Sequence, residues 1–88
     1  MYKLDFTDEG KATFASLDKD IAQRILNKLK WFLQNIDAVN FMPLEGNLSG
    51  LCKLRVGDWR VIYEVDHNRK IITIHKAGHR KEIYKYLH

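Results

Sequence analysis

Two kinds of hydrophobic spacing divide the first half of the chain. Residues 2–6 alternate between apolar and polar side chains, which predicts a short strand. From Asp18 to about Ile36, apolar residues recur every three or four positions, which predicts a helix lying on a core. A shorter helix is predicted between these segments, because Thr7 can cap its start and acidic residues follow at once. The two helices are expected to form a hairpin.

The second half has the spacing of strands. Between residues 37 and 50 the periodicity disappears, and loop-forming residues take its place: Pro43, Gly46, Asn47, Ser49 and Gly50. Strands are predicted over 52–56, 59–65 and 70–77, joined by tight turns at Gly57-Asp58 and His67-Asn68. A last helical segment is predicted over 80–87. The order β-α-α-β-β-β-α predicts one α+β domain over residues 1–88, with the helical hairpin packed on one face of a mostly antiparallel four-stranded sheet.

The two turns predict which side chains share a face of this sheet. They pair Arg55 with Arg60, and Arg60 with His75. One face is then apolar and suits the helical hairpin; it holds Cys52, Leu54, Val56, Trp59, Val61, Tyr63, Val65, Ile72 and Ile74. The other face carries Lys53, Arg55, Arg60 and His75 beside Ile62, Ile71 and Thr73. Two arginines directly opposite each other repel by a few tenths to about 1 kcal/mol. Their placement favours an anionic ligand, and the alternative is that each pairs with a nearby carboxylate such as Glu64 or Asp58.

Charge sharpens this picture. Of the 88 residues, 1–50 carry 6 Lys and Arg against 7 Asp and Glu, whereas 51–88 carry 9 against 4. The positive field of the chain therefore belongs to its second half, which favours a polyanionic partner there, although a solvated basic surface has the same composition.

Other features narrow the class of protein. No apolar run approaches the roughly 20 residues that span a membrane, and a single cysteine cannot form an internal disulfide. We expect a cytoplasmic protein, with Cys52 acting as a small apolar residue of the core. The histidines lack the spacing of metal ligands, and no glycine-rich phosphate loop is present, so no metal or cofactor is expected.

Two segments resemble a known family. Residues 54–65, LRVGDWRVIYEV, and residues 77–84, AGHRKEIY, are similar to the RelE branch of the RelE/ParE toxin superfamily, which shares the β-α-α-β-β-β order. The resemblance implies an endoribonuclease toxin of a toxin–antitoxin system that enters the ribosomal A site and cuts mRNA there. It also implies contact with ribosomal RNA of the 16S type, and a cognate antitoxin whose acidic and apolar segment wraps the toxin.

The same resemblance implies a set of site residues. The candidate catalytic residues are Lys53, Arg60, Arg80, Tyr84 and His79. The candidate RNA contacts are Arg55, His75, Lys76 and Lys81.

The chemistry of RNA gives these residues roles. The 2′-hydroxyl lies beside its own phosphate, so cleavage requires neither a metal ion nor a protein nucleophile. Arginine stays protonated and suits charge stabilisation, whereas Lys53 or His79 could accept the proton. Tyr84 could stack on a base or simply pack on the sheet. Two alternatives remain: a ParE-like toxin that inhibits DNA gyrase without cutting, and an inactive member that still binds RNA or antitoxin.

Overall fold

A computed structural model describes residues 1–44 and 50–87, and the side chains of 1–44 and 50–85. The expected loop markers Gly46, Asn47 and Ser49 lie outside the described residues. The elements are β1 (Lys3–Phe6), α1 (Asp8–Ala15), α2 (Lys19–Gln34), β2 (Cys52–Val56), β3 (Trp59–Asp66), β4 (Ile71–His79) and α3 (Arg80–Leu87). This is the predicted β-α-α-β-β-β-α order.

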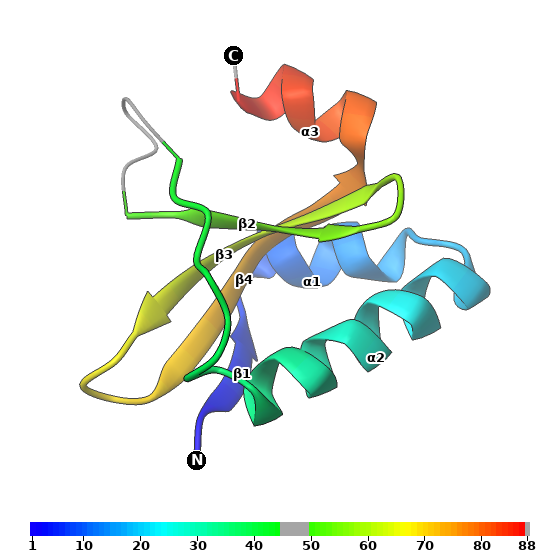
Figure 1. The fold of residues 1–88 in the computed structure, drawn as a ribbon. Coiled ribbons are helices and arrows are strands. Elements are labelled where there is room, and N and C mark those ends of the chain that lie inside the picture. Colours follow the sequence, from blue (N-terminus) through cyan, green and yellow to red (C-terminus); the bar gives the residue numbers. More distant parts are fainter. Residues whose placement is uncertain (45–49, 88) are drawn as a thin grey trace.

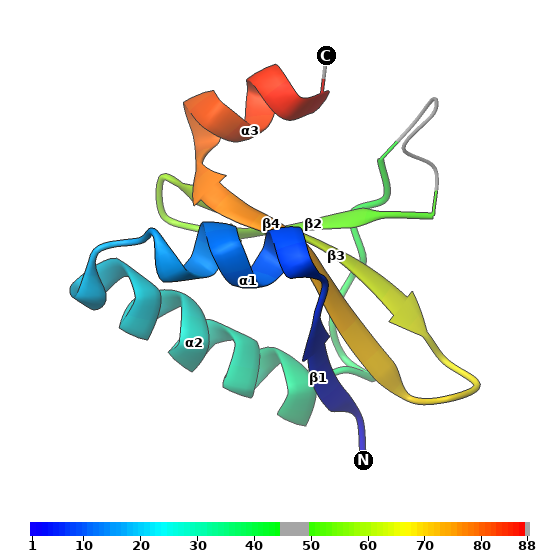
Figure 2. The ribbon, with the colours of Figure 1, turned by 180° about the vertical axis from the view of Figure 1, so that it is seen from behind.

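The four strands form one sheet in the order β1-β4-β3-β2. β1 pairs with β4 in parallel, and the other two pairs are antiparallel. α1 and α2 lie together on one face of the sheet, and α3 lies on the other (Figures 1 and 2). The predicted α+β architecture is confirmed, and the cover that α3 gives to the second face is an addition to it.

The start of α1 is held tightly against the sheet. Thr7 caps the helix, since its hydroxyl accepts a hydrogen bond of 3.0 Å from the Gly10 amide. Gly10 is buried there, because a Cβ at this position would collide with the carbonyl oxygen of Ile74 in β4. Only glycine therefore lets α1 approach β4 this closely.

The main core lies between the helical hairpin and the sheet. All nine predicted core-face residues of the strands belong to it, either buried or packed against the buried cluster. From α2, the cluster contains Ile25, Leu29 and Phe32. Trp31 is off this stripe and 46% exposed. On the opposite face, Ile62 and Ile83 are fully buried outside this cluster, where α3 covers the sheet.

The register of the sheet is only partly as predicted. The Gly57-Asp58 turn gives the expected pairs, including Arg55 opposite Arg60. The next connection is a four-residue turn over 67–70 rather than a two-residue turn, and the pairing shifts by one residue between Ile62 and Tyr63. Arg60 consequently pairs with Gly78, and the predicted pairing of Arg60 with His75 is wrong.

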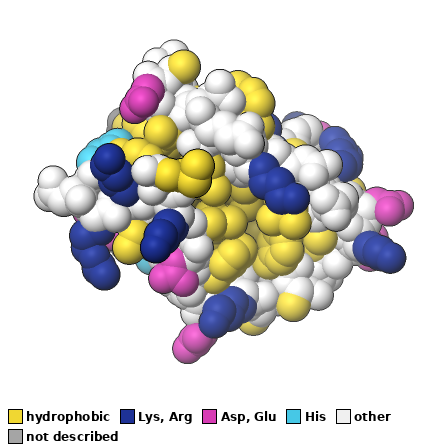
Figure 3. Space-filling model, turned by 90° about the horizontal axis from the view of Figure 1, so that it is seen from below, with side chains coloured by type: hydrophobic (Ala, Val, Ile, Leu, Met, Phe, Trp, Pro, Cys, Tyr) yellow, Lys and Arg dark blue, Asp and Glu magenta, His cyan; other side chains and the backbone are white. Residues whose placement is uncertain are grey.

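The surface combines apolar and basic areas. Seen from below, hydrophobic side chains gather in the middle of the molecule, and Lys and Arg side chains lie around them (Figure 3). In the part of the chain that the structure describes, no helix has the length and apolar character needed to cross a membrane.

Candidate functional site

The β2–β3 turn is the meeting point of three candidate arginines. Arg55 and Arg60 face each other on the two strands that the turn joins. Arg80, the first residue of α3, donates its backbone N–H to the Asp58 carbonyl in the turn at 2.8 Å. One end of the sheet thereby brings together cations that are up to 25 positions apart in sequence. The arginine cluster is defined here as Arg55, Arg60 and Arg80.

Arg60 is the buried member of this cluster. It is 7% exposed, and its Nη1 donates to the carbonyl oxygens of Gly57 and Trp59, both at 2.8 Å. Together with the bond from Arg80 to Asp58, three consecutive carbonyls of the turn are occupied. The Arg60 guanidinium therefore holds the turn that Arg55 precedes and to which the Arg80 backbone is bonded.

The cluster carries no compensating carboxylate. Within the described side chains, Lys53, Lys81 and the three arginines form no ion pair with Asp or Glu. The alternative that Glu64 or Asp58 neutralises the arginines is thus not what the structure contains, since Glu64 contacts His75 instead. Uncompensated guanidinium groups at a surface are suited to binding phosphate.

Lys53 and Tyr84 border the cluster on the α3 side of the sheet. Lys53 lies two residues before Arg55 on β2, hence on the same face, and pairs with the buried Ile62. Tyr84 lies four residues after Arg80, on the same side of α3, and is 44% exposed. The ring is therefore accessible from solvent.

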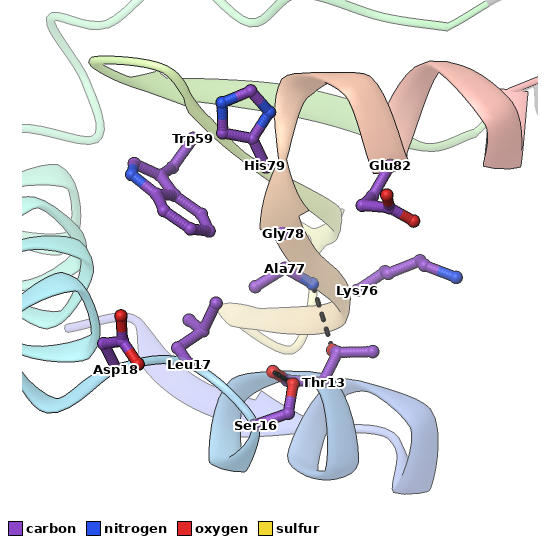
Figure 4. Close-up of a pocket in the computed structure, with 10 residues that line it drawn as sticks. All are labelled: Thr13, Ser16, Leu17, Asp18, Trp59, Lys76, Ala77, Gly78, His79 and Glu82. Carbon is purple, nitrogen blue, oxygen red and sulfur yellow. Dashed lines mark hydrogen bonds between the residues drawn. The ribbon is translucent and has the colours of Figure 1, made fainter.

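His79 lies on the other side of the sheet. It pairs with Trp59, and the two rings meet edge to face with centroids 5.3 Å apart. Both line a hollow of about 500 Å³ between the α1–α2 corner and the end of β4 (Figure 4). The His79 Nδ1 accepts a hydrogen bond of 3.2 Å from the Lys81 backbone N–H. His79 and Lys53 thus do not share a face, contrary to the possibility that both point into one cleft.

Two further candidates are engaged elsewhere. His75 lies at the β-bulge, and its Nε2 is 3.0 Å from Glu64 Oε1. Lys76 donates to Glu9 Oε1 of α1 at 3.1 Å. Lys81, by contrast, is exposed beside Arg80 at the start of α3. Of the four predicted RNA contacts, Arg55 precedes the β2–β3 turn by two residues, and Lys81 follows Arg80, which is bonded to that turn. His75 and Lys76 instead contact carboxylates of β3 and α1.

The sequence named Asp58 as a turn residue and possible carboxylate partner, and Trp59 as a core-face residue, but it predicted neither of the roles that they have here. Asp58 accepts the bond that attaches α3, and Trp59 forms a wall of the hollow beside His79. A turn residue that acts through its backbone carbonyl leaves no pattern in the sequence. Among the described residues, no group of three or more His, Cys, Asp or Glu is placed to hold a metal ion.

A family comparison decides the class of protein. Residues 4–84 match the family model described as the ParE toxin of the type II toxin–antitoxin system parDE. The chain belongs to this toxin family. The resemblance to the RelE/ParE superfamily inferred from the sequence is thereby confirmed.

Solved structures of other toxins share the fold. The RelBE2 toxin–antitoxin complex from Mycobacterium tuberculosis matches with a TM-score of 0.79 at 23% identity, over 90% of this chain and 98% of that one. The isolated Escherichia coli RelE toxin matches with a TM-score of 0.74 at 18% identity, over 100% of both chains. The archaeal RelE–RelB complex from Pyrococcus horikoshii has a TM-score of 0.65 at 27% identity, over 90% and 94%. A search of curated proteins found no match.

Cys52 gives a test of the core beneath this toxin site. Burial raises the pKa of its thiol, and a hydrogen bond with Tyr63 opposes this in part. A raised pKa leaves less thiolate at a given pH, and thiolate is the form that reacts. We expect iodoacetamide to alkylate native Cys52 at pH 8 several-fold more slowly than the urea-unfolded chain, measured by mass spectrometry. Equal rates in the two states would contradict this placement.

Proposed function

We propose that this toxin is an endoribonuclease that cuts mRNA in the ribosomal A site. The observation that carries the proposal is the arginine cluster: three arginines whose main chains meet at one turn, and whose side chains form no ion pair with a carboxylate among the described residues. Such an arrangement is costly in isolation and favourable around a phosphate whose charge grows during cleavage.

The reaction would proceed by attack of the 2′-hydroxyl on the adjacent phosphate. A base removes the hydroxyl proton, the new O2′–P bond forms as the P–O5′ bond breaks, and an acid protonates the departing 5′-oxygen. The exposed Arg55 and Arg80 would stabilise the phosphate charge, and Arg60 would hold the turn that positions them. Tyr84 would stack on a nucleobase, and the exposed Lys81 would contact the RNA backbone.

Lys53 is the better placed base. It lies on the face of the arginine cluster, whereas His79 lies across the sheet with its Nδ1 already accepting a bond from Lys81. We expect Lys53→Met to lower single-turnover cleavage by about 10²–10⁴-fold and His79→Gln to leave it near wild type. The reverse ranking on programmed ribosomes would transfer the role of base to His79.

A ParE-like function without cleavage is the second candidate. It is favoured by the description of the matching family model and by the buried state of Arg60, which uses its Nη1 within the protein. Mapping mRNA ends in a translation extract separates the two. An endoribonuclease gives codon-phased cuts, whereas a gyrase inhibitor gives none and instead blocks supercoiling of relaxed plasmid by purified gyrase.

The proposed activity also implies surroundings and partners. Ribosomes engaged on mRNA, with 16S-type ribosomal RNA around the A site, place the toxin in the cytoplasm. A cognate antitoxin would neutralise it with an acidic and apolar segment. Several of the matching structures are complexes of a toxin with its antitoxin.

A further inference from the structure

A groove runs between α2 and β2, away from the hollow beside His79. It consists of two adjoining hollows of about 230 and about 470 Å³ that share Lys28 and Trp31 as walls. One hollow continues over the segment that follows α2, where Met42 lies, and the other extends along α2 to Arg24. The α2–β2 groove is defined by Arg24, Lys28, Trp31, Met42, Lys53 and Arg55.

The charges in this groove have one sign. Four cations line it: Arg24 and Lys28 belong to α2, and Lys53 and Arg55 belong to β2. Because β2 is an edge strand of the sheet, Lys53 and Arg55 border this groove at the sheet edge, although they alternate with the core-facing Leu54. No Asp or Glu of the described chain lines either hollow. Arg24 reaches the β2–β3 turn, because its Nη2 lies 2.9 Å from the position that a Cβ would take on Gly57. Residues 1–50 carry a small excess of acidic residues, so this positive strip on α2 is a local feature.

The floor of the groove is apolar. Trp31 and Met42 are large apolar side chains, 46% and 38% exposed, and both belong to this one groove. Other apolar residues that line it are Phe32, Ala38, Val39, Leu54 and Val56. The Lys28 Nζ lies 4.2 Å from the centre of the Trp31 ring, so one face of the indole is already covered by a cation.

We propose that the α2–β2 groove binds the antitoxin through a segment that seats a large apolar side chain against Trp31 and Met42 and directs carboxylates to Arg24 and Lys28. The inference rests on the toxin–antitoxin assignment and names the surface that it requires. Aliphatic walls and a half-covered indole fit an apolar side chain better than a stack of nucleobases, which needs open ring faces. The uniformly positive rim requires an acidic occupant.

The groove also explains how binding would silence the toxin. Lys53 and Arg55 line the groove and are members of the proposed cleavage face. A carboxylate that binds either side chain withdraws it from RNA. The antitoxin would thus neutralise the base and one charge stabiliser without covering Arg80.

The test uses the full chain and, as the probe, the purified protein encoded by the gene adjacent to the toxin's. Titration calorimetry at fixed salt compares wild type with Trp31→Ala and Lys28→Glu. We expect each variant to weaken binding by about 30-fold or more, as for a central interface residue. Lys30→Glu is the matched control: Lys30 is exposed on the same helix but lines neither hollow, and it should change binding less than about threefold. Trp31→Phe should retain most of the affinity.

Three outcomes would overturn the proposal. The adjacent gene product does not bind wild type, or Trp31→Ala and Lys28→Glu bind it as wild type does, or these variants lose affinity only for a 12-nucleotide single-stranded RNA. Because Trp31 is exposed, circular dichroism should be unchanged in its variants. Cleavage by free Trp31→Ala should equal wild type. If wild type itself fails to cut mRNA, the proposed function fails while the binding result stands.

Discussion

Replacing Arg80 with alanine should lower mRNA cleavage by about 10²–10³-fold, the usual effect of removing one group that stabilises charge in a transition state. The side chain is exposed, and the main chain at this position is held independently by the bond from the Arg80 N–H to the Asp58 carbonyl. Alanine preserves that bond and suits the first turn of α3. The fold should therefore survive while the activity is lost.

Arg69→Ala is the control for Arg80→Ala. Arg69 is also an exposed arginine, but it lies in the turn at the opposite end of β3 and β4, where its backbone N–H donates to Asp66. Both variants remove one positive charge, so a general loss of electrostatic attraction to RNA would affect them alike. Single-turnover cleavage on programmed ribosomes should fall only for Arg80→Ala. If that variant cuts mRNA as wild type does, the arginine cluster is not the site.

Replacing Arg60 with alanine should destabilise the protein by roughly 1.5–3 kcal/mol, because hydrogen bonds from a charged donor to two turn carbonyls are lost. Relief of repulsion from Arg55 returns at most about 1 kcal/mol. Urea unfolding measures the difference in the free energy of unfolding, and a domain of this size should also melt roughly 6–24 °C lower. Cleavage should fall as well, since the turn no longer holds Arg55 and Arg80 in place.

Arg55→Ala separates the loss of the turn hydrogen bonds from the loss of one positive charge. Arg55 is the exposed partner directly opposite Arg60, and its removal relieves the same repulsion without breaking the turn. Its free energy of unfolding should be unchanged or raised by at most about 1 kcal/mol relative to wild type. Equal stability of Arg60→Ala and Arg55→Ala would mean that the bonds to Gly57 and Trp59 contribute nothing in solution.

The sequence predicted the β2–β3 pairing because Gly57-Asp58 marks a two-residue hairpin turn, and the length of the turn sets which residues of the two strands pair. Gly57 takes a positive φ of 61°, as a two-residue hairpin turn requires, and glycine adopts it without a steric penalty. The opposition of Arg55 and Arg60 follows directly from that turn. The pattern of residues alone was therefore sufficient to place this part of the candidate site.

The predicted β3–β4 register was wrong for two local reasons. The connection has four residues, and its last residue, Lys70, adopts a φ of 57°. Lysine rarely adopts a positive φ, so the sequence did not indicate this longer turn. The bulge between Ile62 and Tyr63 has no residue signature either. Near the turn the predicted β3–β4 register was wrong by two residues. A shift of two leaves each side chain on the same face, so Ile72 and Ile74 remain on the core face. Beyond the bulge the alternation reverses, which places His79 beside Trp59.

The sequence did not predict that α3 covers the sheet face opposite the helical hairpin. Ile62 was grouped with the basic face, yet it is fully buried, as is Ile83 of α3. The sequence predicted α3 as a segment but contained no information on which side of the sheet it returns to. That direction is held by the bond from Arg80 to Asp58 and by the burial of Ile83, which are tertiary features.

The parallel pairing of β1 with β4 sets the order in which this toxin can assemble during its synthesis. β1 and the cap of α1 have no sheet to join until β4 exists, since Thr7 and its contact Ile74 are 67 positions apart. A contact of such long range is slow to form and leaves the early helices without a partner while translation continues. Arg80 follows β4 immediately. The same short stretch of synthesis therefore completes the sheet and supplies the third arginine, so a partly made chain has neither the fold nor the proposed means to attack the ribosome that is making it.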